Sequence, residues 1–420
     1  MNKVLIITYY WPPSGGAGVQ RWLKFSKYLP QYGWEPVILT VDPSYATYPA
    51  IDSSLGNEIP GNIEIHKTRA TDWFRIYLKD KSKIPSAGFA RNMDNSFKGK
   101  LSRFIRGNFF IPDPRKGWNK YAVEKACELI NKYKITTIVT TSPPHSTQLI
   151  GLELKKKYPG LKWISDLRDP WTDIYYYELF YPTFISRKID AYFEKSVLTN
   201  ADIITTVGAT LGKHFESKVP GIGNKIKIIH NGYDETDFEN IEVKLPQKFT
   251  ISFTGSISDS YPIDGFLKAV RKVLKNEKNL LLSFTGLVSK DQKKEITAYI
   301  EEKNLEFADY ADHKDAIRQM MTSSVLLLVI AKHPENRSFL SGKLFEYIAS
   351  GKPVLCLGPV DGDAANILNN SGAGKCFTYD DETGIAEFII STMNEPPAEI
   401  KTRPVEYSRK YLAQQIAQLF

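Results

Sequence analysis

Short apolar runs alternate with helical patterns along almost the whole chain, and this alternation limits the possible folds more than any other feature. The run KVLIITYY is followed by a helical pattern with Val19, Trp22 and Leu29 on one face, and then by the strand-like run EPVILTV. Pro30 and Gly33 close that helix. Because such alternation calls for a parallel sheet covered by helices on both faces, the sequence predicts an α/β protein.

The alternation is interrupted once, by the polar and acidic stretch at residues 234–248, which reads as a linker. It restarts with the run FTISFTGS at 249–256. A chain of 420 residues is also too long for one ordinary core. We therefore expect two doubly wound Rossmann-like domains, at residues 1–235 and 247–395, and a helix at 404–420 that packs back on the body.

Three glycine-bearing turns follow strand-like runs, at 14–18, 254–258 and 285–289. In doubly wound folds ligands bind beyond the carboxyl ends of the strands, so we expect a cleft between two facing sheet edges. Glycine lets a ligand approach the backbone, and the next helix presents N–H groups to an anion. Gly255 and Gly286 are therefore candidates for binding such a ligand. Gly15 and Gly16 are candidates for a loop that closes over it.

The segment SGKLFEYIASGKPVL in the C-terminal half is the most informative. Ser341 is suited to cap a helix that begins at Gly342, and Gly351 is suited to end it. Lys343 lies in the first turn, where its ammonium and the backbone N–H groups suit a diphosphate. Glu346 lies one turn deeper, where a carboxylate can accept both hydroxyls of a ribose. The alternative is a surface Lys–Glu pair on an amphipathic helix.

These residues resemble the donor-binding helix of GT-B glycosyltransferases of the family 4 type. The opening YYWPPSGGAGVQR resembles that family's glycine-rich N-terminal loop, and HNGYD at 230–234 resembles the element that leads to its second domain. The resemblance implies a GT-B architecture and a retaining, metal-independent transfer from a nucleotide sugar, with no other cofactor. It also implies that Glu346 binds the ribose of the donor.

The resemblance has two gaps. Many members carry a Glu eight positions before the ribose Glu, where this chain has Ser338, and Glu335 is the nearest acid. The Arg and Lys that often follow the first C-terminal glycine turn are missing from GSISDSYPIDGFLK. We therefore expect Lys343 to neutralise most of the diphosphate charge, with help from Arg337.

Charged residues also gather behind a strand-like run in the N-terminal half. The segment SDLRDPW places Asp166, Arg168 and Asp169 at the end of the run KWISDL. Carboxylates there can orient or deprotonate an acceptor hydroxyl, with Arg168 controlling their charge; an Asp–Arg pair that braces the loop is the alternative. We take Asp166, Asp169 and Lys343 as the candidate catalytic residues. His145, which follows another strand, is a further candidate on the acceptor side.

The composition argues against several kinds of site. Cys127, Cys356 and Cys376 form no CxxC pair, which argues against a disulfide framework or a structural zinc site. The histidines show no metal-ligand spacing, so we expect no catalytic metal. No apolar run approaches the ~20 residues that cross a bilayer, and no signal peptide is recognisable. These observations predict a cytoplasmic protein.

A basic tract at residues 97–121 interleaves seven Lys or Arg with Phe, Ile and Trp. The remaining basic residues are spread over both halves, so the net charge of +8 does not lead us to expect a nucleic-acid partner. Basic residues beside bulky apolar ones suit an anionic bilayer; an amphipathic helix that closes the domain is the alternative. We favour peripheral membrane contact, because sugar transfer to a polyprenyl-linked acceptor takes place there.

Together these features predict a retaining glycosyltransferase of polysaccharide biosynthesis, which moves a sugar to a hydroxyl of a surface glycan or of its lipid-linked precursor. A sugar-nucleotide epimerase of the same shape would share the donor helix. An NAD-dependent oxidoreductase is supported by GAG at 16–18 and by Asp42 behind a strand, although Arg21 stands where the third fingerprint glycine belongs. A non-catalytic basic scaffold on a membrane is the third alternative.

Overall fold

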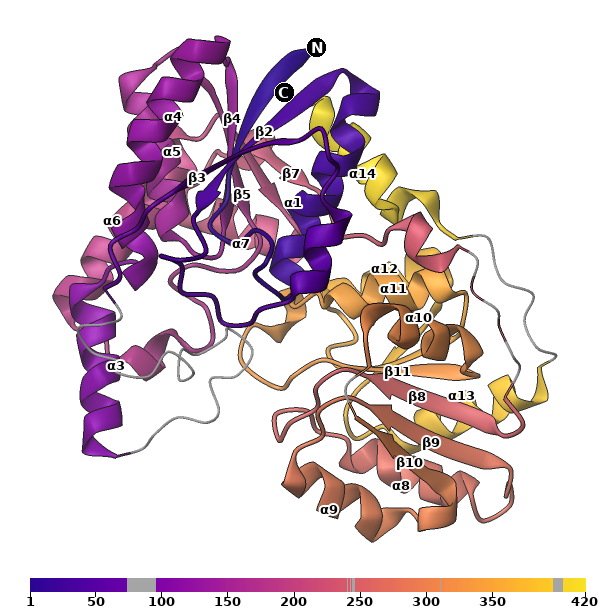
Figure 1. Ribbon diagram of the computed structural model, residues 1–420. Helices are drawn as coiled ribbons and strands as arrows, with labels where there is room; N and C mark the ends of the chain where they lie inside the picture. Colours follow the sequence, from indigo (N-terminus) through magenta and orange to yellow (C-terminus); the bar gives the residue numbers. More distant parts are fainter. Residues whose placement is uncertain (74–95, 240, 242, 244–245, 310, 396–402) are drawn as a thin grey trace. The chain divides into compact units, whose positions relative to one another are not determined.

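The computed structural model describes residues 1–73, 96–239, 241, 243, 246–309, 311–395 and 403–420. These residues form two compact units (Figure 1). The first consists of Met1–His230 together with Lys410–Phe420, and the second of Asn231–Arg409. Each unit is built on a parallel sheet, which confirms the expected α/β class with two doubly wound, Rossmann-like sheets.

In the first unit the strands are β1 (Asn2–Ile7), β2 (Trp34–Val41), β3 (Glu64–Thr68), β4 (Thr137–Ser142), β5 (Lys162–Leu167), β6 (Ile203–Thr206) and β7 (Ile226–Ile228). The helices among its described residues are α1 (Ala17–Tyr28), α3 (Phe97–Phe109), α4 (Asn119–Tyr133), α5 (Ser146–Lys157), α6 (Phe184–Asn200), α7 (Ala209–Lys218) and α14 (Arg409–Ala417). The strand order is β3-β2-β1-β4-β5-β6-β7. β4 and β5 are almost entirely buried, as central strands covered on both faces are.

In the second unit the strands are β8 (Phe249–Thr254), β9 (Leu280–Thr285), β10 (Leu305–Ala308), β11 (Val325–Val329), β12 (Val354–Leu357) and β13 (Gly374–Phe377). The helices are α8 (Asp264–Val273), α9 (Lys290–Tyr299), α10 (His313–Thr322), α11 (Gly342–Ser350), α12 (Asp363–Ser371) and α13 (Glu382–Asn394). The strand order is β10-β9-β8-β11-β12-β13. The described residues of this unit form two hydrophobic cores, one beneath α8 and α13 and the other beneath α10, α11 and α12.

Each sheet has one point where the strand order reverses. It lies between β1 and β4 in the first unit, and between β8 and β11 in the second. Loops that leave two such strands turn toward opposite faces of the sheet, and the crevice between them is where doubly wound folds bind ligands. The fold therefore singles out the loops that follow these four strands.

The boundary between the units falls earlier than the sequence suggested. The first unit ends at His230 instead of residue 235, because the chain beyond it joins the second core. Phe238 is buried there beside Tyr233, whose backbone N–H donates to the carbonyl of Tyr407 at 3.0 Å. The described part of 234–248 is thus packed and is not a free linker. Residues 240, 242 and 244–245 lie outside the described residues.

The C-terminal segment is divided between the two units. Residues up to Arg409 belong to the second unit, so the expected helix at 404–420 is shorter and begins at Arg409. From Lys410 onward α14 packs on the first unit, where Leu412 and Ile416 are buried in the same core as Trp22 of α1. None of the described helices is both long and apolar enough to cross a bilayer.

Candidate functional site

Two glycine turns lie against each other at the carboxyl edge of the second sheet. Gly255 follows β8 and Gly286 follows β9, with φ angles of +109° and +114°. A Cβ at position 286 would lie 2.5 Å from the carbonyl oxygen of Gly255. Only glycine suits both positions. A side chain would be strained at these φ angles and would collide with atoms that lie close to the backbone there. The two turns share one sheet edge, as the sequence suggested.

Helix α11 begins and ends at the residues expected from the sequence. The Ser341 Oγ accepts from the backbone N–H of Lys343 at 3.3 Å and caps the helix. Gly351 ends it with a φ of +74°. The buried positions Leu344 and Tyr347 fix α11 on the second core. Lys343 and Glu346 are only partly buried and lie outside that core.

The Lys343 side chain lies beside the Gly255 turn. Its Nζ is 4.4 Å from the centroid of the Phe253 ring, and a Cβ on Gly255 would lie 2.5 Å from the same Nζ. Among the described residues no carboxylate forms an ion pair with it. Burial lowers the pKa of Lys343 to about 8, although Glu346 opposes this shift. A cation held over an aromatic ring, at a glycine turn and a helix N-terminus, is suited to an anionic ligand.

Glu346 also lacks a hydrogen-bond or ion-pair partner within the described part of the chain. Burial raises the pKa of its carboxyl, while the charges of His313 and Arg409 oppose the increase and Asp237 adds to it. A partly buried carboxylate without a donor is costly unless a ligand supplies one. Its position one turn beyond Lys343 agrees with the role expected from the sequence, which remains a prediction.

Arg337 is engaged elsewhere. Its guanidinium lies 3.0 Å from the carboxylate of Asp361, and both side chains are more than half exposed. Contact between Arg337 and a diphosphate would require this surface ion pair to open, at little cost. The neighbouring Glu335 adopts a left-handed conformation with a φ of +63° in the same loop, which follows β11.

In the first unit, the loop between β1 and α1 places Gly15 and Gly16 at the point of strand reversal. The Gly15 N–H donates to the carbonyl of Ala50 at 3.0 Å, and a Cβ at Gly15 would lie 3.2 Å from the Cβ of Asp52. Gly16 has a φ of +98°, and a Cβ there would meet no atom within 4 Å. Gly15 therefore packs against its own unit, whereas Gly16 leaves open space at the start of α1.

Arg168 ties this loop to the strand ends. Its Nη1 donates to the carbonyl of Gly18 at 2.9 Å and its Nε to the carbonyl of Ser142 at 3.0 Å. Burial lowers its pKa, and the nearby Asp166 and Asp169 oppose that shift. The side chain thus ties the first turn of α1 and the end of β4 to the loop after β5, which is the structural role that the sequence left open as an alternative.

Asp166 is fully buried, and its carboxylate is surrounded by donors. It accepts from the Arg21 Nε and Nη2, the Trp22 Nε1, and the hydroxyls of Thr141 and Thr205, at 2.7–3.3 Å. Burial alone would raise its pKa, but the two guanidinium groups of Arg21 and Arg168 outweigh burial and lower it. These contacts oppose the catalytic role expected for Asp166. The Asp166 carboxylate instead has a structural role, because it holds α1 on β5.

Asp169 is placed differently. It is partly buried, and no described residue forms a hydrogen bond or an ion pair with its carboxylate. Burial raises its pKa, with Arg168 opposing the shift. A carboxylate with a raised pKa and vacant acceptor positions is the better of the two candidates for contacting an acceptor hydroxyl.

His145 lies at the start of α5 and stacks on Trp171, with ring centroids 4.8 Å apart and an angle of 12° between the planes. Burial lowers its pKa to about 4, so the ring is neutral near pH 7. Neither ring nitrogen meets hydrogen-bond geometry with a described residue. The Trp171 Nε1 donates to the Asp190 carboxylate at 2.7 Å, which fixes the stacked pair.

Arg21 has a structural role that its sequence position, a departure from a glycine fingerprint, did not indicate. Arg21 is 1% exposed and also donates from Nη1 to the carbonyl of His230 at 2.7 Å. It therefore joins α1, the end of β5 and the HNGYD motif. One signal was available: Asp166 stands in a strand-like apolar run, and a buried carboxylate requires a partner.

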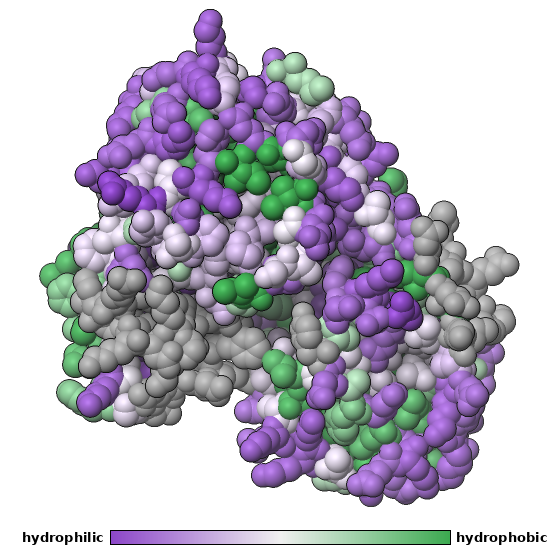
Figure 2. Space-filling view, viewed as in Figure 1, coloured by the Kyte–Doolittle hydropathy of each residue, from purple (hydrophilic) through white to green (hydrophobic). Residues whose placement is uncertain are grey.

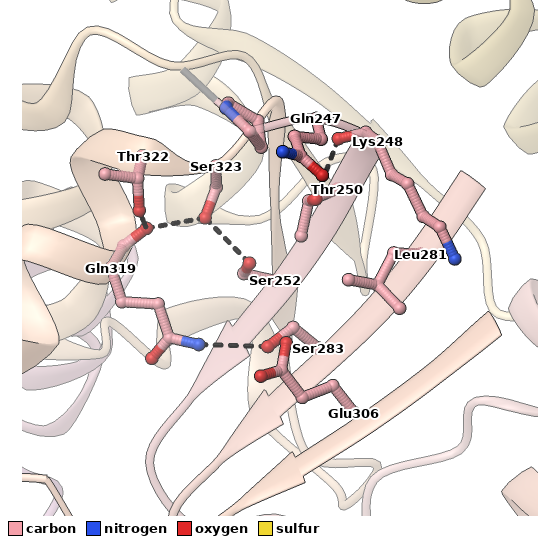
Figure 3. A pocket seen from close by; sticks show the side chains of 11 residues that line it. Gln247, Lys248, Thr250, Ser252, Leu281, Ser283, Glu306, Gln319, Thr322 and Ser323 are labelled. Carbon is pink, nitrogen blue, oxygen red and sulfur yellow. Dashed lines mark hydrogen bonds between the residues drawn. The ribbon is translucent and has the colours of Figure 1, made fainter. Parts of the chain in front are cut away.

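A cavity of about 660 Å³ lies elsewhere on the second unit. Figure 3 shows it between α10 and the face of β8, β9 and β10, toward the amino ends of the strands. Four of its polar side chains bond in pairs: the Ser323 hydroxyl donates to Ser252 at 2.7 Å, and the Gln319 amide to Ser283 at 3.0 Å. With these groups satisfied, the cavity is a weaker candidate than the edge with Lys343 and Glu346.

Solved structures of other proteins match this chain over nearly its whole length. No family profile and no curated protein matches the chain. The sucrose-phosphate synthase of Thermosynechococcus elongatus matches in structure, with a TM-score of 0.63 and 14% identity over 100% of this chain and 98% of that one. The Anabaena protein Alr3699/HepE, solved in complex with UDP, matches with a TM-score of 0.57 and 12% identity over 99% and 94%. The chain has the GT-B fold.

The same fold extends to another class of enzyme. A putative UDP-N-acetylglucosamine 2-epimerase from Listeria monocytogenes matches with a TM-score of 0.56 and 10% identity, over 99% of this chain and 94% of that one. At such identities the likeness shows the fold alone, and enzymes of different activity share it. The reaction must therefore be inferred from the residues of this chain.

Proposed function

We propose that the protein is a retaining glycosyltransferase of the family 4 type, which transfers a sugar from a nucleotide sugar to a hydroxyl of a surface glycan or its lipid-linked precursor. The observation that carries the proposal is the pair formed by Lys343 and Glu346 on α11. Both charges are partly buried and unpaired within the described residues, and both pKa values are shifted toward the neutral forms. A bound nucleoside diphosphate would supply the missing partners, its phosphates for Lys343 and its ribose hydroxyls for Glu346.

In this proposal the second unit holds the donor. Lys343 and the first turn of α11 bind the diphosphate and stabilise it as it leaves, so that a fixed cation performs the task that a metal performs in other enzymes. Gly255 and Gly286 allow the phosphates close to the backbone, and Glu346 accepts the ribose hydroxyls. Arg337 assists at the rim after leaving Asp361.

The acceptor hydroxyl is assigned to the carboxyl edge of the first unit. Asp169 orients it or accepts its proton. His145, whose ring nitrogens are both buried, supports this loop by stacking on Trp171. Arg168 holds Gly18 and thereby the loop that contains Gly16. Asp166 contributes only by fixing this arrangement.

The proposal is tested with a panel of nucleotide sugars, using membrane extract as the source of acceptor. Release of nucleoside diphosphate that depends on the acceptor, with radiolabelled sugar in the product, is the expected result. Glu346→Ala should lose donor affinity, whereas Glu387→Ala, an exposed Glu on α13, serves as the matched control and should keep it. Full donor affinity in Glu346→Ala would refute the assignment.

The epimerase remains the second candidate, because an epimerase is among the proteins of similar structure. It would interconvert two nucleotide sugars without any acceptor and without net release of nucleoside diphosphate. Measuring the free diphosphate with and without acceptor separates the two reactions.

The oxidoreductase alternative loses support from the position of Asp42. Its carboxylate accepts from the backbone N–H and the hydroxyl of Ser44, at 2.9 and 2.5 Å, and so caps a turn. The Gly18 of the GAG triplet packs against Arg168. A thermal-shift screen distinguishes the remaining possibilities: stabilisation by UDP or GDP supports the transferase or epimerase, by NAD the oxidoreductase, and by none of them the scaffold.

A further inference from the structure

Helix α3 turns an apolar stripe toward the solvent. Phe97, Leu101 and Phe104 recur at helical spacing and are 80%, 46% and 38% exposed. None of the helix's residues is buried. An amphipathic helix on a soluble domain normally turns such a stripe inward, so α3 has the opposite orientation.

The beginning of α6 continues this exposed surface. Phe184 and Ile185 are each 70% exposed, and Tyr192 is 67% exposed. α3 and α6 contact each other. We call the six side chains of Phe97, Leu101, Phe104, Phe184, Ile185 and Tyr192 the α3–α6 surface. Figure 2 shows hydrophobic atoms along the left edge of the view, where Figure 1 places these two helices.

The two helices are held together by specific contacts. The Asn108 side chain donates to the carbonyl of Tyr181 at 3.0 Å and accepts from the Thr183 N–H at 2.7 Å and the Ser186 hydroxyl at 2.6 Å. Gly107 allows the close approach, because a Cβ there would lie 2.3 Å from the carbonyl oxygen of Phe180. The apolar side chains are therefore presented by a fixed support.

The charges around the α3–α6 surface are mainly basic. The sequence of α3, FKGKLSRFIRGNF, contains four Lys or Arg and no acid. Lys98 and Lys100 are exposed and have no carboxylate partner among the described residues. On α6, Lys188 is exposed and its Nζ lies 4.4 Å from the Phe184 ring centroid, whereas Asp190 is buried. An apolar centre within a basic border is complementary to anionic headgroups above acyl chains.

We propose that the α3–α6 surface docks the protein on an anionic lipid bilayer. A second copy of the chain fits less well, since a two-fold contact would bring the same basic border against itself. The α3–α6 surface includes only the α3 part of the tract at 97–121, and it adds side chains of α6 that lie outside this tract. Residues 110–121 turn into the first unit, where Trp118 is 1% exposed, while α6 adds side chains from a separate segment.

The test is co-sedimentation of the full chain with vesicles, in the absence of any nucleotide sugar. The wild type should bind vesicles of phosphatidylglycerol and phosphatidylcholine but not vesicles of phosphatidylcholine alone. Binding should weaken when NaCl rises from about 0.1 M to about 0.5 M. A Phe97→Ser/Phe184→Ser/Ile185→Ser variant and a Lys98→Glu/Lys100→Glu variant should each bind at least about tenfold more weakly.

Matched controls use residues of the second unit with similar exposure. Ile390→Ser/Val405→Ser and Lys272→Glu/Lys275→Glu should bind as the wild type does. All substituted side chains are exposed, so unchanged circular dichroism and Tm are expected for each variant.

Failure of the wild type to bind anionic vesicles would overturn the proposal, and so would wild-type binding by both α3–α6 variants. The proposal would also be overturned if the wild type is a dimer and the Phe97→Ser/Phe184→Ser/Ile185→Ser variant is a monomer. In that case a second copy of the chain would occupy the α3–α6 surface. Because no donor is present, these outcomes are independent of the proposed transferase activity.

Discussion

The Lys343 ammonium occupies the space that a side chain on Gly255 would fill, since a Cβ there would lie 2.5 Å from its Nζ. The glycine turn and the cation of α11 are thus parts of one arrangement, although they are far apart in the sequence. Lys343 can take this position only while residue 255 has no side chain.

We therefore predict that Gly255→Ala displaces Lys343 and weakens UDP binding by about tenfold or more, measured by isothermal titration, because a charge-assisted contact is lost. The φ of +109° also makes alanine strained, at about 1–2 kcal/mol of stability. Gly372→Ala is the control. Its φ is +61° and a Cβ would meet nothing within 4 Å, so it should lose similar stability and keep UDP affinity. Equal affinity in the two variants would contradict the assignment.

UDP affinity should depend on pH through Lys343. Burial lowers its pKa to about 8, so the free protein loses this charge as the pH rises through that value. Because only the ammonium attracts the diphosphate, affinity should begin to fall as the pH approaches 8 and should then fall by up to tenfold per pH unit. Titrations of wild type and Lys343→Met from pH 7 to 9.5 check this. A similar decline in the variant would mean that another group is responsible.

Asp166→Asn and Asp169→Asn should have opposite consequences. Asp166→Asn leaves Arg21 buried without its charge partner, which should cost about 3–5 kcal/mol in urea unfolding. Asp169→Asn removes a carboxylate that burial already disfavours, so stability should be unchanged or higher. Transfer to the acceptor should nevertheless fall in Asp169→Asn while UDP affinity is kept. If Asp169→Asn transfers sugar as the wild type does, the acceptor assignment is wrong.

Asp190 should make the stability of the first unit depend on pH. Burial raises its pKa to about 6, so the folded state holds a proton that the unfolded state has released at the same pH. Its contribution to stability is present in acid and is lost as the pH rises through about 6, by roughly 2–3 kcal/mol in total. Asp190→Asn can still accept from Trp171, so it should stabilise the protein at pH 8 relative to wild type and remove that dependence. Urea unfolding at pH 5 and pH 8 measures both effects.

Much of the fold was predictable because its signals are local. Apolar runs and glycine or proline breaks located the strands within a few residues, and the limits of α11 followed from Ser341 and Gly351. The points at which the strand order reverses could not be predicted from local sequence patterns, because they depend on which strands pair. The assignment of 234–248 failed because polar composition does not reveal that Phe238 and Tyr233 are anchored in a core.

The candidate site was predictable to a smaller extent. Neighbouring positions on one helix brought Lys343 and Glu346 to attention, but their lack of partners is a property of the whole unit. Asp166 and Asp169 look equivalent in SDLRDPW, and only long-range contacts from Arg21 and Thr205 distinguish them. The outward orientation of α3 was equally hidden, since the periodicity of an apolar stripe does not say which way it faces.

The return of α14 to the first core has a consequence for biogenesis. Leu412 and Ile416 cover the side of α1, and the Phe420 ring packs on Trp34 at 5.1 Å between centroids. Most of the first unit is synthesised first, but its core stays incomplete until Lys410–Phe420 have been synthesised. The second unit lies between these two segments in the sequence, so its own sequence is complete earlier. Nascent chains that stop before Lys410 should expose the apolar face around Trp22 and become substrates for chaperones or proteases.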